Sequence, residues 1–149
     1  MSLFLHVLQL SEIDQILTLE SRHLKDRVPD EMERQLQSWN ARWRREALEY
    51  YLPLGWSFCA KEDSELVGYF LGQAFMYIDG QTQALWIEHM QFSNLQVRDN
   101  LVELAIKLGR EKHLQKVYFP NEPTLNSALH PYKSEVWTPS TLMVRTTKI

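Results

Sequence analysis

The spacing of the apolar residues changes along the chain, and this change constrains the fold more than any other feature. From residue 56 to residue 92 the apolar residues form strand-like runs separated by short polar connectors. From Leu101 they recur in steps of three and four, which places them on one face of a helix. A short apolar run at Val117–Phe119 then ends at Pro120. This succession predicts an α/β domain with a mixed sheet.

The connectors between the first three runs predict an antiparallel meander. The expected strands are 56–61, 66–78 and 84–92. They are joined by the polar connector Glu62–Ser64 and by the hairpin sequence Asp79-Gly80. The long middle strand should therefore lie near the centre of the sheet. Because a helix separates the last of these strands from Val117–Phe119, we expect those two strands to run parallel and to splay apart around a cleft.

The first fifty residues predict one strand followed by two helices. The strand is expected at 4–10, and a helix capped by Ser11 should end near Val28, because Pro29 disfavours a helical residue before it. A second helix is expected over about 30–51, with a capping box at its start. Its apolar positions fall on one face, which predicts that this face is buried. Those positions are Met32, Leu36, Trp39, Trp43, Ala47 and Tyr50.

The segment Trp39–Arg45 mixes aromatic and basic residues, a combination that also occurs on nucleic-acid-binding surfaces. Trp39 and Trp43 lie four residues apart on the predicted buried face, and Glu46 and Glu49 dilute the positive charge. The favoured interpretation is therefore a helix that faces the core with its tryptophans and the solvent with its arginines.

The chain shows no repeat, low-complexity tract or linker, which predicts a single domain over residues 1–149. After the strand at Val117–Phe119, the last expected elements are a short helix at 124–129 and a strand at 140–147. The complete predicted order is β-α-α-β-β-β-α-β-α-β, a mixed sheet flanked by helices.

Composition argues against several classes of partner. Sixteen basic and 19 acidic residues give a formal net charge of -3, which predicts neither nucleic acid nor a membrane surface as a partner. The one cysteine, Cys59, allows no internal disulfide and no cysteine-rich zinc cluster, which favours a reducing, cytoplasmic location. The N-terminus does not have the pattern of a signal peptide, and no run approaches the about 18 apolar residues of a membrane span. The histidines lack metal-ligand spacing, so no metal site is predicted.

Three stretches have the pattern of one known family. In Glu65–Tyr69 an apolar pair precedes a glycine, and Ile87, Met90 and Phe92 continue the apolar spacing in the next strand. The helical pattern of 101–112 then leads to Lys116-Val117. This arrangement resembles the GNAT superfamily of acyl-CoA-dependent N-acyltransferases over nearly the whole chain. The resemblance implies transfer of an acetyl group from acetyl-CoA, as co-substrate, to an unidentified small-molecule or peptide amine. The resemblance is also compatible with a homodimer.

The segment Ser93–Asn100 differs from the loop that follows the fourth strand in that family. The family's loop has the form Q/R-x-x-G-x-G/A, and its backbone N–H groups hold the CoA pyrophosphate at a helix N-terminus. Here the loop is shorter and lacks glycine, and Asp99 and Glu103 place negative charge beside it. We predict a tight turn into the helix, capped by Asn100 or Asp99. The resemblance implies cofactor contacts from Phe92, Leu95, Gln96, Val97, Arg98, Asn100 and Leu101.

Three residues are candidates for the chemistry that the resemblance implies. Glu88 or His89, on the fourth strand, would deprotonate the amine, and Tyr132, four residues after Ala128, would protonate the departing thiolate. The alternative is that these residues have structural roles. Strand alternation would then expose either Glu88 or His89 to solvent, and a neighbouring side chain would form a hydrogen bond with the other. Tyr132 would be a packing residue. In the GNAT fold the first helices flank the acceptor site, so Trp39 or Trp43 could line a pocket. Two functions remain open, an acetyltransferase and a non-catalytic GNAT-like binding or interaction domain that has lost CoA.

Overall fold

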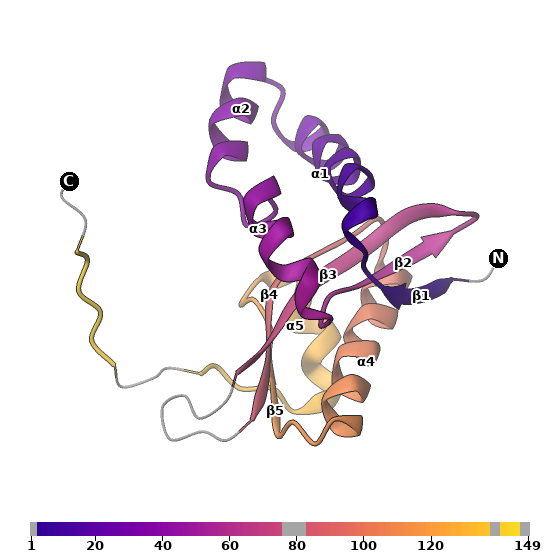
Figure 1. The fold of residues 1–149 in the computed structure, drawn as a ribbon, viewed down its shortest axis with the longest axis vertical. Helices are drawn as coiled ribbons and strands as arrows, with labels where there is room; N and C mark the ends of the chain where they lie inside the picture. Colours follow the sequence, from indigo (N-terminus) through magenta and orange to yellow (C-terminus); the bar gives the residue numbers. More distant parts are fainter. Residues whose placement is uncertain (1–2, 76–82, 138–140, 147–149) are drawn as a thin grey trace.

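The computed structural model describes residues 3–75, 83–137 and 141–146, and its strands form one five-stranded sheet in the order β1-β2-β3-β4-β5 (Figure 1). The strands are β1 (Phe4–Val7), β2 (Phe58–Glu62), β3 (Glu65–Phe75), β4 (Ala84–Phe92) and β5 (Lys116–Tyr118). β1 to β4 are antiparallel neighbours, and β4 and β5 are parallel. The predicted meander, its central long strand and the parallel last pair are confirmed. The hairpin sequence Asp79-Gly80 lies outside the described residues.

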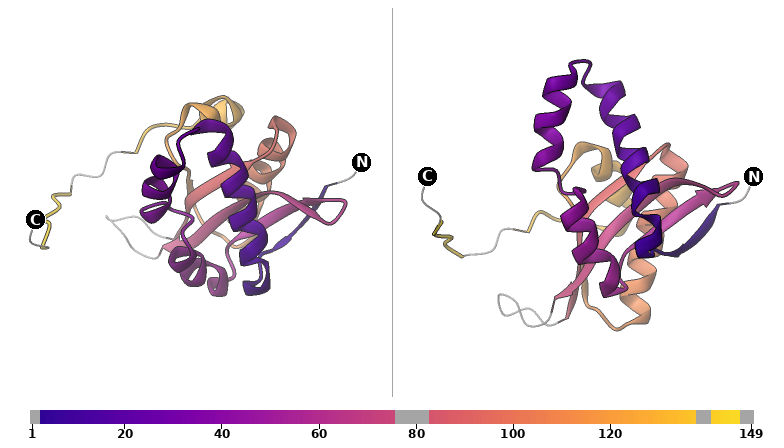
Figure 2. Two further views of the ribbon diagram at one scale, coloured as in Figure 1. Left: turned by 90° about the horizontal axis from the view of Figure 1, so that it is seen from above. Right: turned by 45° about the horizontal axis from the view of Figure 1, so that its top comes forward.

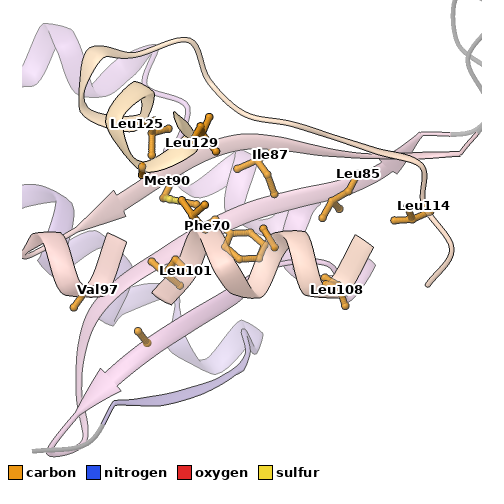
Figure 3. Close-up of a cluster of buried hydrophobic side chains, with 14 residues drawn as sticks. Phe70, Leu85, Ile87, Met90, Val97, Leu101, Leu108, Leu114, Leu125 and Leu129 are labelled. Atoms are coloured by element: carbon orange, nitrogen blue, oxygen red, sulfur yellow. The ribbon is translucent and has the colours of Figure 1, made fainter. Parts of the chain in front are cut away.

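Helices cover both faces of this sheet (Figures 1 and 2). One face carries α1 (Ile13–Arg27) and α3 (Arg45–Tyr51), with α2 (Glu31–Trp39) between them in the chain, and the other carries α4 (Leu95–Glu111) and α5 (Pro123–Leu129). Short 3-10 helices occur at Leu10–Glu12, Leu52–Leu54 and His130–Tyr132. Each face has its own buried apolar cluster, one under α1 and α3 and the other under α4 and α5 (Figure 3). The apolar periods of strands and helices therefore produce two cores that share one sheet.

The start of α1 differs from the prediction, whereas its end agrees. Ser11 lies inside a 3-10 turn and does not cap the helix. The Glu12 side chain accepts the Gln9 backbone N–H at 2.9 Å and closes that turn instead. Val28 is extended at the helix end, as expected before Pro29.

The long helix predicted over 30–51 is wrong, because the structure has two helices there. Asp30 caps α2 through the Met32 N–H, but the helix stops at Trp39 and α3 begins only at Arg45. The break turns Trp43 and Leu48 toward the core under α1, where Leu48 is fully buried.

The predicted buried face of α2 is consequently exposed. Met32, Leu36 and Trp39 are 69%, 52% and 63% exposed, and α2 contains no buried residue. Figure 1 shows why: the α1–α2 hairpin extends beyond the edge of the sheet, so α2 has no strand beneath it. Helical periodicity identified the helix correctly, but it could not locate the surface against which the helix would pack.

The helix after β4 begins six residues before Leu101, where its apolar periodicity starts. α4 starts at Leu95, and Asn94 caps it by accepting the Val97 N–H at 3.0 Å. The predicted caps Asn100 and Asp99 are wrong, because both residues lie inside the helix. Only Ser93 and Asn94 separate β4 from α4, so the predicted tight turn is present and its helix N-terminus is closed by a protein side chain.

β4 contains a register shift that changes which side chains face which layer. Consecutive residues of β3 pair with Ile87 and His89, so Glu88 is an extra residue, as in a β-bulge. Ile87 before the shift and Met90 after it both belong to the core under α4 (Figure 3). The extra residue at Glu88 therefore shifts the alternation of side chains between the two faces by one position, and His89 faces α1.

The C-terminal region does not complete the sheet as predicted. Residues 141–146 are extended and exposed but form no strand among the described residues, so the expected strand at 140–147 is wrong over that range. Its end residues, 140 and 147, lie outside the described part of the chain. β-propensity gives a strand only where a neighbour supplies hydrogen bonds, and this segment extends away from the sheet (Figure 1). Within the described residues, no helix is long and apolar enough to cross a membrane.

A double-mutant cycle tests the close packing of α4 on β3. A Cβ atom added to Gly68 would lie 2.5 Å from Val97 Cγ1, in the first turn of α4. Gly68→Ala should therefore destabilise the protein by about 1–3 kcal/mol, measured by urea unfolding. In a Val97→Ala background the same change should cost at least about 0.5 kcal/mol less. Equal costs in the two backgrounds would show that α4 does not approach β3 at this point.

Candidate active site

The buried carboxylate of Glu20 joins α1 to the two central strands of the sheet. Glu20 is 2% exposed and accepts hydrogen bonds from three side chains on β3 and β4. The Tyr69 hydroxyl and His89 Nε2 contact Oε2, the latter at 2.6 Å, and Gln91 Nε2 donates to Oε1 at 3.0 Å. The Tyr69 and His89 rings also meet edge-on, 5.7 Å apart. A buried carboxylate with this many donors is fully compensated and rigidly placed.

The network fixes Glu20 in its ionised form. Burial alone would raise the pKa of Glu20, but the hydrogen bond and charge of His89, with the bonds from Tyr69 and Gln91, lower it below 4.5. The pKa of Tyr69 moves in the opposite direction, well above 10, because it is buried beside that negative charge. At neutral pH the site therefore contains a carboxylate that holds His89 through Nε2 and a tyrosine that remains a donor.

A pocket of about 240 Å³ opens beside His89. Its lining comes from the end of α1, from α2, from the α2–α3 connection, from β4 and from the residue before α5. The lining residues are Leu24, Arg27, Gln37, Ala41, Arg42, Trp43, His89 and Glu122. His89 lines this pocket, and because it bonds Glu20 through Nε2, Nδ1 is the ring nitrogen that this bond does not use. The expectation that Trp43 could line a pocket agrees with this arrangement, whereas Trp39 is not part of the lining.

Glu88 and His89 occupy different environments although they are adjacent. Glu88 accepts the Trp86 indole N–H at 3.0 Å, and its backbone carbonyl accepts a guanidinium N–H of Arg42 at 3.1 Å. The pKa of nearby Tyr51 rises to about 12, first through burial and then through the charge of Glu88. Glu88 does not line the pocket, so the geometry brings His89, rather than Glu88, to the pocket wall.

Tyr132 lies apart from this network in the described structure. It ends the short 3-10 helix after α5, is 40% exposed, and is not among the residues that line the pocket at His89. Its assignment as the acid that protonates the thiolate stays a prediction.

The residues predicted to hold the cofactor occupy the end of β4 and the first two turns of α4. Val97 and Leu101 are buried in the core under that helix, and Leu95 is exposed. Arg98 is nearly buried and donates to the Thr124 carbonyl at 3.0 Å and to Ser127 Oγ at 3.1 Å, which ties α4 to α5.

The other predicted cofactor residues lie nearby. Phe92 ends β4 and is half-buried. Gln96 is exposed, and its carbonyl accepts the Asn100 amide N–H at 2.8 Å. The role of these residues in binding CoA stays a prediction, and its backbone donors would come from the N-terminal turn of α4.

β4 offers backbone groups on the side that faces β5. The parallel pairing of these two strands involves only Ala84, Leu85 and Trp86 of β4. From Ile87 onward, the described residues include no strand that pairs with this edge of β4. The parallel pairing is as expected, whereas the splaying of the two strands around a cleft stays a prediction, because β5 ends at Tyr118 and pairs with β4 along its whole length.

A second polar cluster joins β1, β2 and the first turn, where the sequence predicted no metal site. His6 Nε2 lies 3.0 Å from Glu12 Oε2 and 3.2 Å from Cys59 Sγ, and the three ligand-type atoms lie within 4.8 Å of one another. Lys61 Nζ already contacts Glu12 Oε2 at 2.7 Å. Burial raises the pKa of Cys59 to about 12, so its thiol is protonated at neutral pH. The Lys61 ammonium thus supplies the positive charge that a metal ion would otherwise supply in this cluster.

The antiparallel strands β1 to β4 and the parallel β4–β5 pair, with helices on both faces, form the fold of the GNAT acetyltransferases. Structures that share this fold include the protein TTHA1254 from Thermus thermophilus, with 17% identity, a TM-score of 0.62 and 98% coverage of both chains. A ribosomal-protein-alanine N-acetyltransferase from Brucella melitensis biovar Abortus 2308 is 15% identical, with a TM-score of 0.64 over 98% of this chain and 100% of that one. A predicted acetyltransferase from Clostridium acetobutylicum, solved with acetyl-CoA, is 12% identical, with a TM-score of 0.64 over 97% and 96%.

The chain itself belongs to the DUF1999 family, described as proteins of unknown function, which it matches over residues 5–142. No curated protein matches this chain.

Sequence reasoning located His89 but missed the residues that orient it. Glu20 lies four residues after Ile16 and four before Leu24, on the apolar stripe of the first predicted helix. An acidic residue on such a stripe must be paired if it is buried, so this position carried a readable signal. Gln91 carried none, because only the bulge at Glu88 turns it, together with His89, toward α1 rather than into the core under α4.

Glu20→Gln should test whether the buried carboxylate stabilises the fold in its charged form. A glutamine has one acceptor oxygen for three donors, so we expect a loss of about 2 kcal/mol at pH 7. The folded-state pKa of Glu20 is lowered, so its contribution is present above about pH 4.5 and is lost as pH falls through the folded value. The difference between the wild type and the variant in urea unfolding should therefore shrink at pH 4. A difference that is constant with pH would contradict this account.

Proposed function

We propose that this protein is an N-acyltransferase that moves an acetyl group from acetyl-CoA to an amine bound beside His89. The observation that carries the proposal is the Glu20–His89 pair at the wall of a pocket: Nε2 bonds a buried carboxylate at 2.6 Å, and Nδ1 is left for the pocket. A base must lie within hydrogen-bond reach of the proton that it removes, directly or through one water. An amine bound in this pocket would lie beside His89, which supports His89 as the base.

The chemistry requires no nucleophile on the protein. The amine nitrogen attacks the thioester carbonyl once it has lost a proton to His89, and Glu20 stabilises the imidazolium that forms. Cys59 is unsuited to a covalent route, because it is fully buried and burial raises its pKa to about 12.

Two features support acyl-CoA as the donor. The edge of β4 beyond Trp86 can pair with the amide groups of a pantetheine arm as a strand would. The first turn of α4 can take the pyrophosphate, although the Asn94 cap already uses the Val97 N–H. A predicted acetyltransferase with the same fold was solved with acetyl-CoA, which supports acetyl-CoA as the donor.

A non-catalytic interaction domain is the second candidate, and one observation favours it. Met32, Leu36 and Trp39 form an exposed apolar stripe on α2, as on surfaces that bind other proteins. The two candidates differ in the use of acetyl-CoA, since an interaction domain has no need to bind it.

Calorimetric titration with acetyl-CoA tests the proposal first. We expect saturable binding at one site per chain, with desulfo-CoA, which cannot react, bound by the same site. The physical reason is that both ligands present the same pantetheine and phosphates to the β4 edge and the α4 N-terminus. No heat from either ligand at millimolar concentration would favour the interaction domain and reject acyl transfer.

Replacement of His89 separates catalysis from binding. His89→Asn removes the proposed base, so kcat for amine-dependent CoA release should fall by about 10²–10⁴-fold, while acetyl-CoA affinity changes little. His113→Asn is the matched control, because His113 is exposed and has a φ of 60°, which asparagine also tolerates. If both variants keep wild-type turnover, His89 is not the base.

A further inference from the structure

The pocket beside His89 carries more positive charge than an amine alone requires. Its lining includes two arginines, Arg27 at the end of α1 and Arg42 between α2 and α3, and one acid, Glu122, before α5. A site for a simple amine or polyamine should be acidic, because such substrates are cationic at neutral pH. We propose that the acceptor is a small amine that also carries an anionic group, and that Arg27 and Arg42 bind that group. This inference rests on the proposed acetyl transfer.

Arg42 is held beside the base by the strand itself. One guanidinium N–H donates to the backbone carbonyl of Glu88 at 3.1 Å, and Glu88 directly precedes His89. The bulge at Glu88 thus places the base and anchors the arginine in the same pocket. A guanidinium has five N–H donors, so this bond leaves others for a carboxylate, which arginine binds in a two-bond fork.

The size of the pocket limits the acceptor. Its volume of about 240 Å³ lies below the roughly 300–1,000 Å³ of sites for drug-sized ligands. Leu24 and Trp43 give it apolar walls between the polar groups. A molecule the size of an amino acid fits this combination, and a carboxylate is the anionic group that such a molecule carries.

Glu122 provides the complementary charge for the amine. It enters the pocket from the segment that follows β5, whereas the arginines come from the helical layer over the other face of the sheet. The acceptor ammonium gives one proton to His89, which passes it to water. As the new N–C bond forms, the thioester C–S bond breaks, and a second proton from the nitrogen reaches the CoA sulfur. The products are the N-acetyl amino acid and free CoA.

Matched acceptors test the inference directly. Release of CoA from acetyl-CoA would be followed with glycine against glycinamide, with β-alanine against β-alaninamide, and with 2-aminoethyl phosphate. We expect kcat/KM at least about 10-fold higher for the anionic member of each pair, as one charge-assisted contact provides. Preference for 2-aminoethyl phosphate over β-alanine would identify the anionic group as a phosphate and support the anion site. Equal or greater activity with the neutral amides would overturn the anion site. The release of CoA in the same assay would still support the proposed acetyl transfer.

Arginine variants test which side chains produce the preference for anionic acceptors. Arg42→Gln and Arg27→Gln should each reduce the acid-to-amide ratio of kcat/KM toward one, and Arg110→Gln, an exposed change at the end of α4, should preserve it. Unchanged ratios in both pocket variants would overturn the assignment.

Calorimetry of β-alanine and β-alaninamide without acetyl-CoA separates this inference from the proposed function. Preferential binding of β-alanine that Arg42→Gln abolishes would support the anion site even if no transfer occurred, in which case only the proposed function would fail. Equal binding of the two ligands would overturn the anion site.

Discussion

The ionised carboxylate of Glu20 is the constraint on which the candidate site depends. It is buried between α1 and the centre of the sheet, where an unpaired charge would be strongly unfavourable. Tyr69, His89 and Gln91 compensate it, and in doing so they fix the position of α1 against β3 and β4. The same bonds orient the imidazole toward the pocket. Structural stability and the orientation of the proposed base therefore depend on one interaction, which would account for a charge in a core that apolar residues could have filled.

The bulge at Glu88 makes that interaction available. Regular alternation after Ile87 would direct His89 into the apolar core under α4, where an imidazole would lack a partner. One extra residue turns it toward α1 and leaves a backbone carbonyl that positions Arg42. The described pairing of β4 with β5 ends at Trp86, so the proposed base, the basic pocket and a strand edge without a strand neighbour among the described residues occur within a few residues of one another. The arrangement of strands and helices shows the GNAT fold. The acyl transfer proposed for this chain rests instead on the particular residues that this fold brings together.

The fold was largely readable from the sequence, because it depends on local periodicity. The strand runs, the helix spacing and the polar connectors predicted the meander, the central strand and the parallel last pair. The errors occur where packing overrides local pattern. α2 has the apolar stripe of a core helix but lies beyond the sheet, and the segment 141–146 has the composition of a strand but no neighbour among the described residues. The candidate site was readable only in part. Glu88 and His89 stood out together as polar residues on an apolar strand, whereas the link of His89 to Glu20, 69 residues away, depends on a bulge that has no sequence signature.

The central claim is that Glu20 holds His89 with Nε2 protonated and Nδ1 free to accept a proton in the pocket. Nitrogen-15 NMR of the histidine side chains tests this claim most directly, since protonated and unprotonated ring nitrogens have well-separated chemical shifts. In the wild-type protein at pH 8, the account predicts a proton on Nε2 of His89 and none on Nδ1, and Glu20→Gln should weaken that preference between the tautomers. A proton on Nδ1 with Nε2 unprotonated, or a ring that stays doubly protonated at pH 9, would show that His89 cannot serve as the base and would contradict the account.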